Sequence, residues 1–287
     1  MATQTTLTSS KAWAPDQNIF SPADAVPNAL ILSHSTVGGV IEGDEPALRV
    51  AYVDDADAQF TAEGTEIPEA DPALNEILVY TGKITQLVRL SREQYLQNGT
   101  ANQLSDSVAR AVTRKADAAF LTQQAPGSGD NAPPAGLVNI ADIIEGGPVD
   151  NDLDALIDLT AQLEANGATP SGIIVDPIGW ASLRKLKTAQ DANTTLLGSG
   201  TNQAERLLLD LPVTVSAALD ENTGVVVDNT AVVSAVGPVN IAVDESVYFT
   251  SDSVATRATF RIGWNVVRPD RIGTFTISAD TDAGVEG

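Results

Sequence analysis

The pattern of apolar and polar residues divides the chain into an irregular beginning, a helical middle and a β-rich end. Residues 1–46 carry four prolines and many Ser, Thr and Ala residues without a sustained period, which predicts an extended arm rather than a domain. Partly alternating apolar residues over 48–53 and 74–90 predict two strands. The connection 54–72 is long and aperiodic, and connections of that length are usually functional or disordered.

The longest predicted element is a helix over about residues 101–124, in the stretch ANQLSDSVARAVTRKADAAFLTQQ. About 21 of these residues, at roughly 1.5 Å each, make a helix of about 30 Å, and Pro126-Gly127 ends it. The apolar face of this helix, defined by helical spacing, consists of Leu104, Val108, Val112, Ala119 and Phe120.

A strand that leads directly into a helix follows in the middle of the chain. Ile173–Val175 form a short apolar run, with Asp176 at the N-cap position and Pro177 at the first helical position. A helix is also predicted over 152–165, with Leu153, Leu156, Ile157 and Leu163 on its apolar face. The strand-to-helix order is an α/β feature.

The chain is mostly β from residue 207 onward. The last run alternates, which predicts one buried face and one face that presents guanidinium groups. Its apolar side holds Ala258, Phe260, Ile262, Trp264 and Val266, and its polar side holds Arg257, Thr259, Arg261 and Asn265. The predicted strands are 207–219, 225–227, 231–236, 239–243 and 254–267.

Composition excludes several kinds of chemistry. The chain has no cysteine, which excludes disulfides, thiolate catalysis and cysteine-ligated metals. Its single histidine, His34, has no acidic residue close in sequence, so a core or surface role is favoured over a general base. Gly-rich stretches at 126–129 and 198–200 lack phosphate-loop spacing, and the acidic stretches at 220–224 and 280–284 do not complete a calcium loop. The sequence therefore predicts no catalytic, cofactor-binding or metal-binding residues, and no enzyme.

The charge of the chain is strongly acidic and unevenly distributed. The formal net charge of −22 argues against a generic binder of nucleic acid or anionic membranes, and no secretory signal or apolar stretch long enough to span a bilayer is present. Residues 54–76 contain eight acids and no base, whereas the cations gather in three other segments. Such segregation is typical of parts that meet each other or a second copy, although a solvated acidic loop kept for solubility is the simpler alternative. The candidate contact residues are Glu63, Glu66, Glu69, Asp71, Arg89, Arg92, Arg257, Arg261, Arg268 and Arg271.

The order of these elements resembles the major capsid protein of tailed bacteriophages, with the Hong Kong 97-like fold. The matching stretches run in family order through about residues 45–277, and each is loose when taken alone. They are FTAEGTEIPEADPALNEILVYTGKITQLVRLSRE (60–93), ADAAFL (116–121), PPAGLVN (133–139), GIIVDPIGWASLRKLK (172–187) and FRIGWNVVRPDRIGTFTI (260–277).

The resemblance implies an α+β fold of five parts. These are an N-terminal arm (1–46), an extended β-hairpin loop (47–82), a peripheral domain (83–134 and 245–280) with a spine helix at about 101–124, an α/β axial domain (135–244) and a C-terminal tail (281–287). It also implies that many copies form hexamers and pentamers of an icosahedral shell around double-stranded DNA, without catalysis, cofactor or membrane. In this family the extended loop lies over a neighbouring subunit, where an acidic loop would dock on a basic rim.

The resemblance also implies further partners, and two alternative functions stay open. The shell would be the virion capsid, assembled in the host bacterial cytoplasm, and portal, scaffold or decoration proteins are possible partners. Some members of the family cross-link subunits through a lysine in the extended loop, but residues 50–82 contain no lysine. The alternatives are an encapsulin-like nanocompartment shell and an acidic-residue hydrolase.

Overall fold

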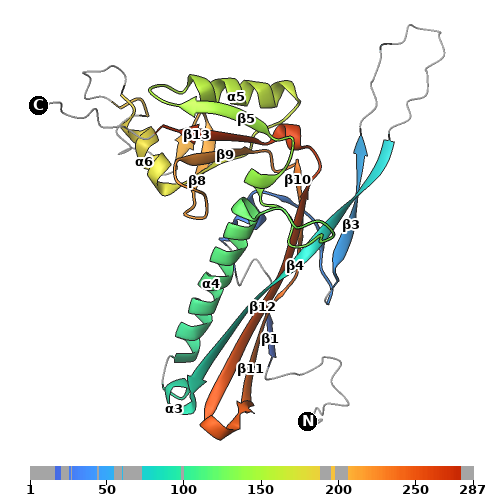
Figure 1. Ribbon diagram of the computed structural model, residues 1–287, viewed down its shortest axis with the longest axis vertical. Coiled ribbons are helices and arrows are strands. Elements are labelled where there is room, and N and C mark those ends of the chain that lie inside the picture. Colours follow the sequence, from blue (N-terminus) through green and yellow to red (C-terminus); the bar gives the residue numbers. More distant parts are fainter. Residues whose placement is uncertain are drawn as a thin grey trace, which may run out of the picture.

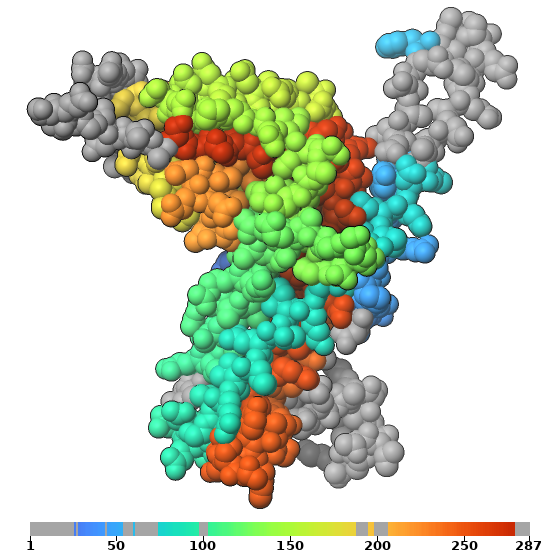
Figure 2. Space-filling view, viewed as in Figure 1, coloured from blue at the N-terminus to red at the C-terminus, as the bar shows by residue number. Residues whose placement is uncertain are grey.

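The described part of the protein consists of a long sheet with one long helix, a compact sheet with two shorter helices, and a hairpin that projects from the body (Figure 1). The computed structural model describes residues 17–20, 26, 28–43, 45–54, 60, 73–97, 100–187, 195–197 and 206–278. In the space-filling view the compact part and the hairpin lie at one end, and the long sheet extends away from them (Figure 2).

The long sheet has seven strands within the described residues, ordered β1-β11-β12-β10-β2, with β4 also paired to β12 and β3 paired to β4. Strand β4 pairs with two strands. Its first part is antiparallel to β3, and its second part is antiparallel to β12. The strands are β1 Gln17–Phe20, β2 Thr36–Val40, β3 Ala47–Asp54, β4 Ala73–Ser91, β10 Val232–Val236, β11 Val239–Tyr248 and β12 Ser253–Val266.

The compact sheet has six described strands in the order β5-β13-β9-β6-β8-β7. They are β5 Ile144–Val149, β6 Gly172–Val175, β7 Leu207–Leu208, β8 Leu211–Val215, β9 Thr223–Val227 and β13 Gly273–Ile277. Helix α5, Asp154–Ala165, packs on β5. Helix α6, Pro177–Lys185, begins with the predicted cap, because the Asp176 carboxylate accepts hydrogen bonds from the backbone amides of Ile178 and Gly179.

The predicted long helix is α4, Thr100–Thr122, and it lies along β4 and β12 (Figure 1). Its predicted apolar face is confirmed, because Val108, Val112 and Phe120 are buried in the largest core cluster. Phe120 meets Trp264 of β12 edge to face, with ring centroids 5.6 Å apart. The remaining short helices are α2 Leu30–Ser33, α3 Arg92–Tyr95, η1 Leu137–Asn139, η2 Phe249–Ser251 and η3 Pro269–Arg271.

The segment around α2 differs from the extended arm predicted for residues 1–46, because it is part of the core. Leu30 and Ile31 are buried against the α4 cluster. The Leu30 amide donates to Asp117 Oδ1 of α4 at 2.8 Å. Burial raises the pKa of Asp117, and this hydrogen bond partly offsets the rise. The other end of α2 is fixed by His34, whose Nε2 lies 3.1 Å from Thr214 Oγ1 of β8.

Three details of the predicted elements were wrong. The run 207–219 is a hairpin of two short strands, because Leu209 and Asp210 both adopt positive φ angles and turn the chain. Strand β5 was not predicted, because Gly146, Gly147 and Pro148 give this segment no strand-like pattern of side chains. Ile157 is exposed, and Leu159 takes the place expected for it in the buried face of α5.

Candidate intersubunit surface

The outer face of the long sheet carries the predicted guanidinium groups. On β12, Phe260, Ile262 and Trp264 are buried, so alternation directs Arg257 and Arg261 to the opposite face, as predicted. The register of β4 places Lys83 beside Arg261 on that face. Two neighbouring strands therefore bring three cations together.

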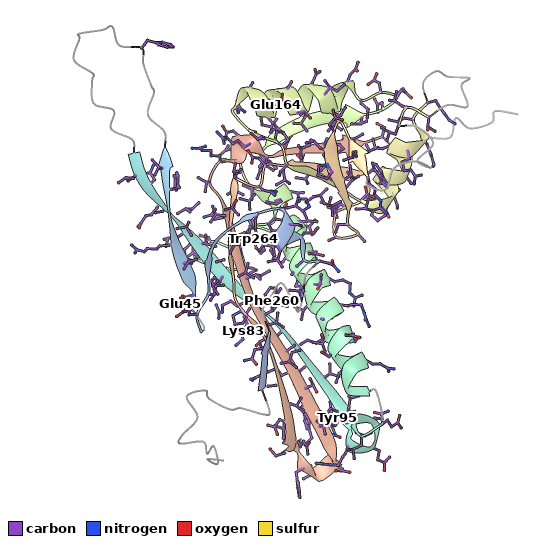
Figure 3. All side chains as sticks on the ribbon, turned by 180° about the vertical axis from the view of Figure 1, so that it is seen from behind. Glu45, Lys83, Tyr95, Glu164, Phe260 and Trp264 are labelled. Atoms are coloured by element: carbon purple, nitrogen blue, oxygen red, sulfur yellow. The ribbon has the colours of Figure 1, made fainter. Side chains whose placement is uncertain are left out.

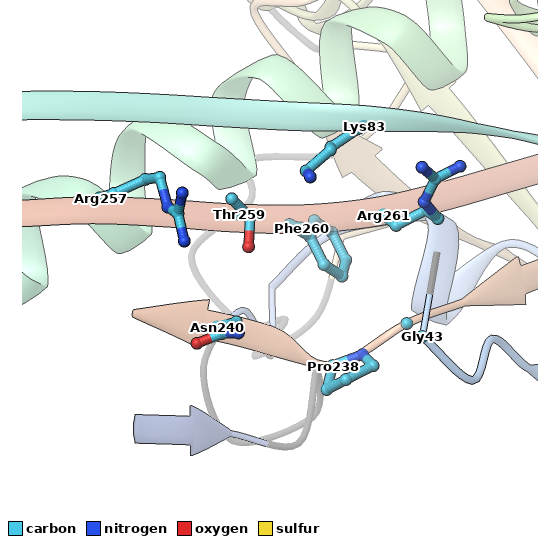
Figure 4. Close-up of a pocket in the computed structure, with 9 residues that line it drawn as sticks. Gly43, Lys83, Pro238, Asn240, Arg257, Thr259, Phe260 and Arg261 are labelled. Carbon is cyan, nitrogen blue, oxygen red and sulfur yellow. The ribbon is translucent and has the colours of Figure 1, made fainter. Parts of the chain in front are cut away.

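These cations line a hollow of about 410 Å³, here called the cationic groove. Figure 4 shows Arg257 and Arg261 of β12 beside it, with Lys83 reaching in from β4. None of the described residues in its lining is acidic; they are Gly43, Lys83, Gly237, Pro238, Asn240, Arg257, Thr259, Phe260 and Arg261. Guanidinium and ammonium groups at this spacing can bind carboxylates through charge-assisted hydrogen bonds.

Lys83 was absent from the contact residues predicted from the sequence. The signal that identifies it is cross-strand register, because Lys83 is opposite Arg261 only when β4 and β12 pair as they do.

Arg89 lies on β4 of the same sheet and Arg92 begins α3 directly after it, and both are engaged within the chain. Arg89 stacks over Tyr248, 4.5 Å from the ring centroid, and its Nη2 donates to Ser251 Oγ at 2.5 Å. Arg92 donates to Asp252 at 2.8 Å and to Glu245 at 2.9 Å. These hydrogen bonds, first to Asp252 and then to Glu245, raise the pKa of Arg92.

Arg268 and Arg271 lie elsewhere, in the connection from β12 to β13. Arg271 is half-buried beside the end of α5, where a Cβ atom on Gly167 would lie 3.1 Å from its Nη2 atom. The structure thus brings Arg257 and Arg261 together and separates them from Arg268 and Arg271. The predicted acidic partners Glu63, Glu66, Glu69 and Asp71 lie outside the described residues.

The hairpin that carries the acidic segment projects from the body (Figure 1). Leu74 is 81% exposed, and Val53 and Leu78 are also exposed. Glu76, one of the eight acids, pairs with Arg49 across the hairpin at 3.2 Å. Because a two-stranded ribbon is only marginally stable alone in water, these exposed apolar side chains favour a hairpin that lies against another surface.

The described residues hold no cluster of potential metal ligands. No three His, Asp or Glu side chains among them gather at a spacing that could hold a metal ion. His34 is buried, and burial lowers its pKa. Its position between α2 and β8 gives it a packing role. Among the described helices, none is long and apolar enough to cross a membrane.

Comparison with known proteins decides the family. A model of the phage capsid family matches residues 29–277. The chain belongs to the phage capsid family. It is a structural, non-enzymatic protein of a bacteriophage, a major capsid protein, which confirms the resemblance seen in the sequence.

Solved structures share the fold at low sequence identity. A chain from Gordonia phage Cozz is 18% identical with a TM-score of 0.65, over 88% of this chain and 87% of that one. A chain from the capsid of a native GTA particle, computed with C5 symmetry, is 17% identical with a TM-score of 0.65, over 88% and 90%. A chain from Microbacterium phage Oxtober96 is 14% identical with a TM-score of 0.64, over 97% and 96%. A search of curated proteins finds no match.

Proposed function

We propose that many copies of this chain form an icosahedral shell, built of pentamers and hexamers, that encloses double-stranded DNA in the virion. Family membership supports a shell. The observation that carries self-assembly is a pair of complementary features of the chain, an exposed hairpin with an acidic segment and a cationic groove elsewhere on the same chain. The formal charge of −22 fits a wall that holds DNA without binding its sequence. Assembly would take place in the cytoplasm of the bacterial host.

In the Hong Kong 97-like scheme, the parts of the chain take these roles. The hairpin β3–β4 with residues 55–72 is the extended loop, and the long sheet with α4 is the peripheral domain. The compact sheet with α5 and α6 is the axial domain, and residues 1–46 form the arm. In this division β13 belongs to the axial domain and β10 and β11 to the peripheral domain, which differs from the expected bounds 135–244 and 245–280. The arm then includes α2, which is packed into the body of the same chain.

The contact between copies joins the extended loop to a neighbour's cationic groove. Glu63, Glu66, Glu69 and Asp71 are the acidic side, and Lys83, Arg257 and Arg261 are the basic side. Arg89 and Arg92 contribute less, because they do not line the groove and are engaged by residues around the end of β11. Each exposed pair is worth only about 0.2–1 kcal/mol, so the contact depends on many weak pairs repeated around a closed shell.

The first test is electron microscopy of the purified chain, with a measurement of nucleic-acid content in particles from infected cells. Closed shells that contain DNA are expected. Closed shells that never contain DNA would instead favour a nanocompartment, and the absence of any closed shell would overturn the proposal.

The loop contact has its own test. We expect Glu63→Gln, Glu66→Gln and Glu69→Gln together to reduce shell yield and to make assembly fail at a lower salt concentration, because the remaining pairs are screened when the Debye length falls below about 8 Å. The matched control removes three exposed acids of the compact part, through Asp142→Asn, Asp158→Asn and Glu164→Gln. Equal yield and salt tolerance for both triple variants would refute the loop contact and leave the shell function standing.

A further inference from the structure

Strand β4 changes partner at a single peptide bond. Its residues up to Tyr80 pair with β3, where Tyr80 is opposite Ala47. From Thr81 onward they pair with β12, where Thr81 is opposite Gly263. The angle between the hairpin and the long sheet is therefore decided at Tyr80–Thr81, here called the elbow.

The elbow is held by a group of hydrogen bonds around Thr81, which is 4% exposed. The Thr81 amide donates to the Pro46 carbonyl at 2.9 Å, and its hydroxyl donates to the Glu45 carbonyl at 2.7 Å. Both bonds tie β4 to the chain entering β3. Figure 3 shows Glu45 at the base of the hairpin, with Lys83 a short way along β4.

Arg261 joins this group to β12. Its Nη1 donates to Thr81 Oγ1 at 2.8 Å and makes longer contacts with the carbonyls of Glu45, at 3.4 Å, and Thr81, at 3.5 Å. One guanidinium of the long sheet therefore contacts Thr81 of β4 and Glu45, which lies just before β3, where the hairpin leaves the body. Charge-assisted hydrogen bonds of this kind are about twice as strong as neutral ones.

Close packing at the elbow makes the geometry demanding. A Cβ atom on Gly263 would lie 2.2 Å from the Tyr80 carbonyl oxygen, so β12 passes the elbow at a distance that only glycine allows. Nearby, Val79 is buried against Ile41, Val233 and Ala235, and Asn265 Nδ2 donates to the Leu78 carbonyl at 2.9 Å. Apolar contacts such as those of Val79 hold the hairpin on the sheet but are non-directional.

We propose that Arg261 is a positioning residue that fixes the angle of the hairpin relative to the long sheet. The residues from Ala73 to Tyr80, at about 3.3 Å each, make a lever of roughly 26 Å. A tilt of about 10° at the elbow moves the far end of that lever by roughly 4–5 Å, which is close to the spacing between neighbouring strands. If the angle at the elbow were not fixed, the acidic segment would therefore be displaced from the neighbour's cationic groove.

This inference rests on the proposed function only for its consequence in assembly, because the angle is a property of one chain. The absence of cysteine allows spin labels to be placed at chosen sites. Labels introduced by Leu74→Cys on the hairpin and Ser107→Cys on α4, both exposed positions, report the hairpin angle by pulsed electron–electron double resonance. Dilution with unlabelled chain removes distances between copies.

The expected result is a distance distribution that is at least twice as broad for Arg261→Ala as for the unsubstituted elbow. Thr81→Val, which removes the hydroxyl but keeps the shape, should broaden it in the same direction. Arg184→Ala, at an exposed position of α6 away from both the elbow and the cationic groove, is the control and should leave it unchanged. A second label pair, Ser107→Cys with Gln162→Cys at an exposed position of α5, should not respond to any of these substitutions.

Unchanged distributions in Arg261→Ala and Thr81→Val would overturn the proposal. If Arg261→Ala does not fold, Thr81→Val alone decides the question. For assembly, we expect Arg261→Ala to give particles of several diameters where the unsubstituted chain gives one. If the unsubstituted chain forms no particles, the proposed function fails, and the distance measurement still decides the role of Arg261.

Discussion

Replacement of Val112 by aspartate tests the packing of α4 on the long sheet. Val112 is 1% exposed and belongs to the largest apolar cluster, together with Val108, Ala116 and Phe120 of the same helix. The Val112→Asp substitution places a carboxyl group in this cluster and removes the two methyl groups that valine packs there. We expect it to prevent stable folding.

The size of the effect can be worked out in two steps. Val112→Ala loses about 0.8 kcal/mol for each of two buried methyl groups, or about 2–3 kcal/mol once the remaining cavity is included. A buried carboxyl group without a partner adds several kcal/mol when it is ionised. Together these terms reach about 5 kcal/mol or more, which is comparable with the whole stability of an ordinary domain, about 5–15 kcal/mol.

The assay is urea unfolding of the unassembled chain, followed by circular dichroism, with transition midpoints compared between variants. Ser107→Asp, at an exposed position of the same helix, is the control and should shift the midpoint little. Burial raises the pKa of the introduced carboxyl group, so the loss in Val112→Asp should shrink as the pH falls through that pKa. Equal midpoints for Val112→Asp and Ser107→Asp would refute the assignment of this helix face.

Two further predictions concern covalent linkage and pH. Particles boiled in denaturant should release chains of 29.8 kDa, because residues 50–82 hold no lysine and the chain holds no cysteine; a ladder of covalent oligomers on a denaturing gel would contradict this. Burial lowers the pKa of His34 below 6.5, so its contribution to stability is complete above pH 6.5 and is lost as the pH falls through its lowered pKa. Chemical unfolding between pH 7 and about pH 5 should show this loss in the unsubstituted chain and a smaller one in His34→Gln, and equal losses would contradict it.

Local patterns in the sequence predicted those elements whose residues repeat at one period. The α4 helix, the Asp176-capped start of α6 and the alternation of β12 follow from side-chain spacing and from one cap, and the structure confirms each. The patterns failed where backbone conformation or packing partners decided the outcome. Positive φ angles split 207–219 into two strands. Helix α2 is buried because its Leu30 amide donates to Asp117 and its apolar side chains pack in the cluster around α4.

The sequence by itself determined the charge segregation, the absence of thiol chemistry and the family resemblance, because these depend only on which residues occur and in what order. Tertiary structure decided which cations act together. Residues far apart in sequence, Lys83 and Arg261, become neighbours only through the β4–β12 register. It also separated the roles of two arginines that look alike in one alternating strand, since Arg261 lies at the elbow beside Thr81 and Arg257 does not. That difference depends on where β4 changes partner, which is a property of strand pairing and not of local sequence.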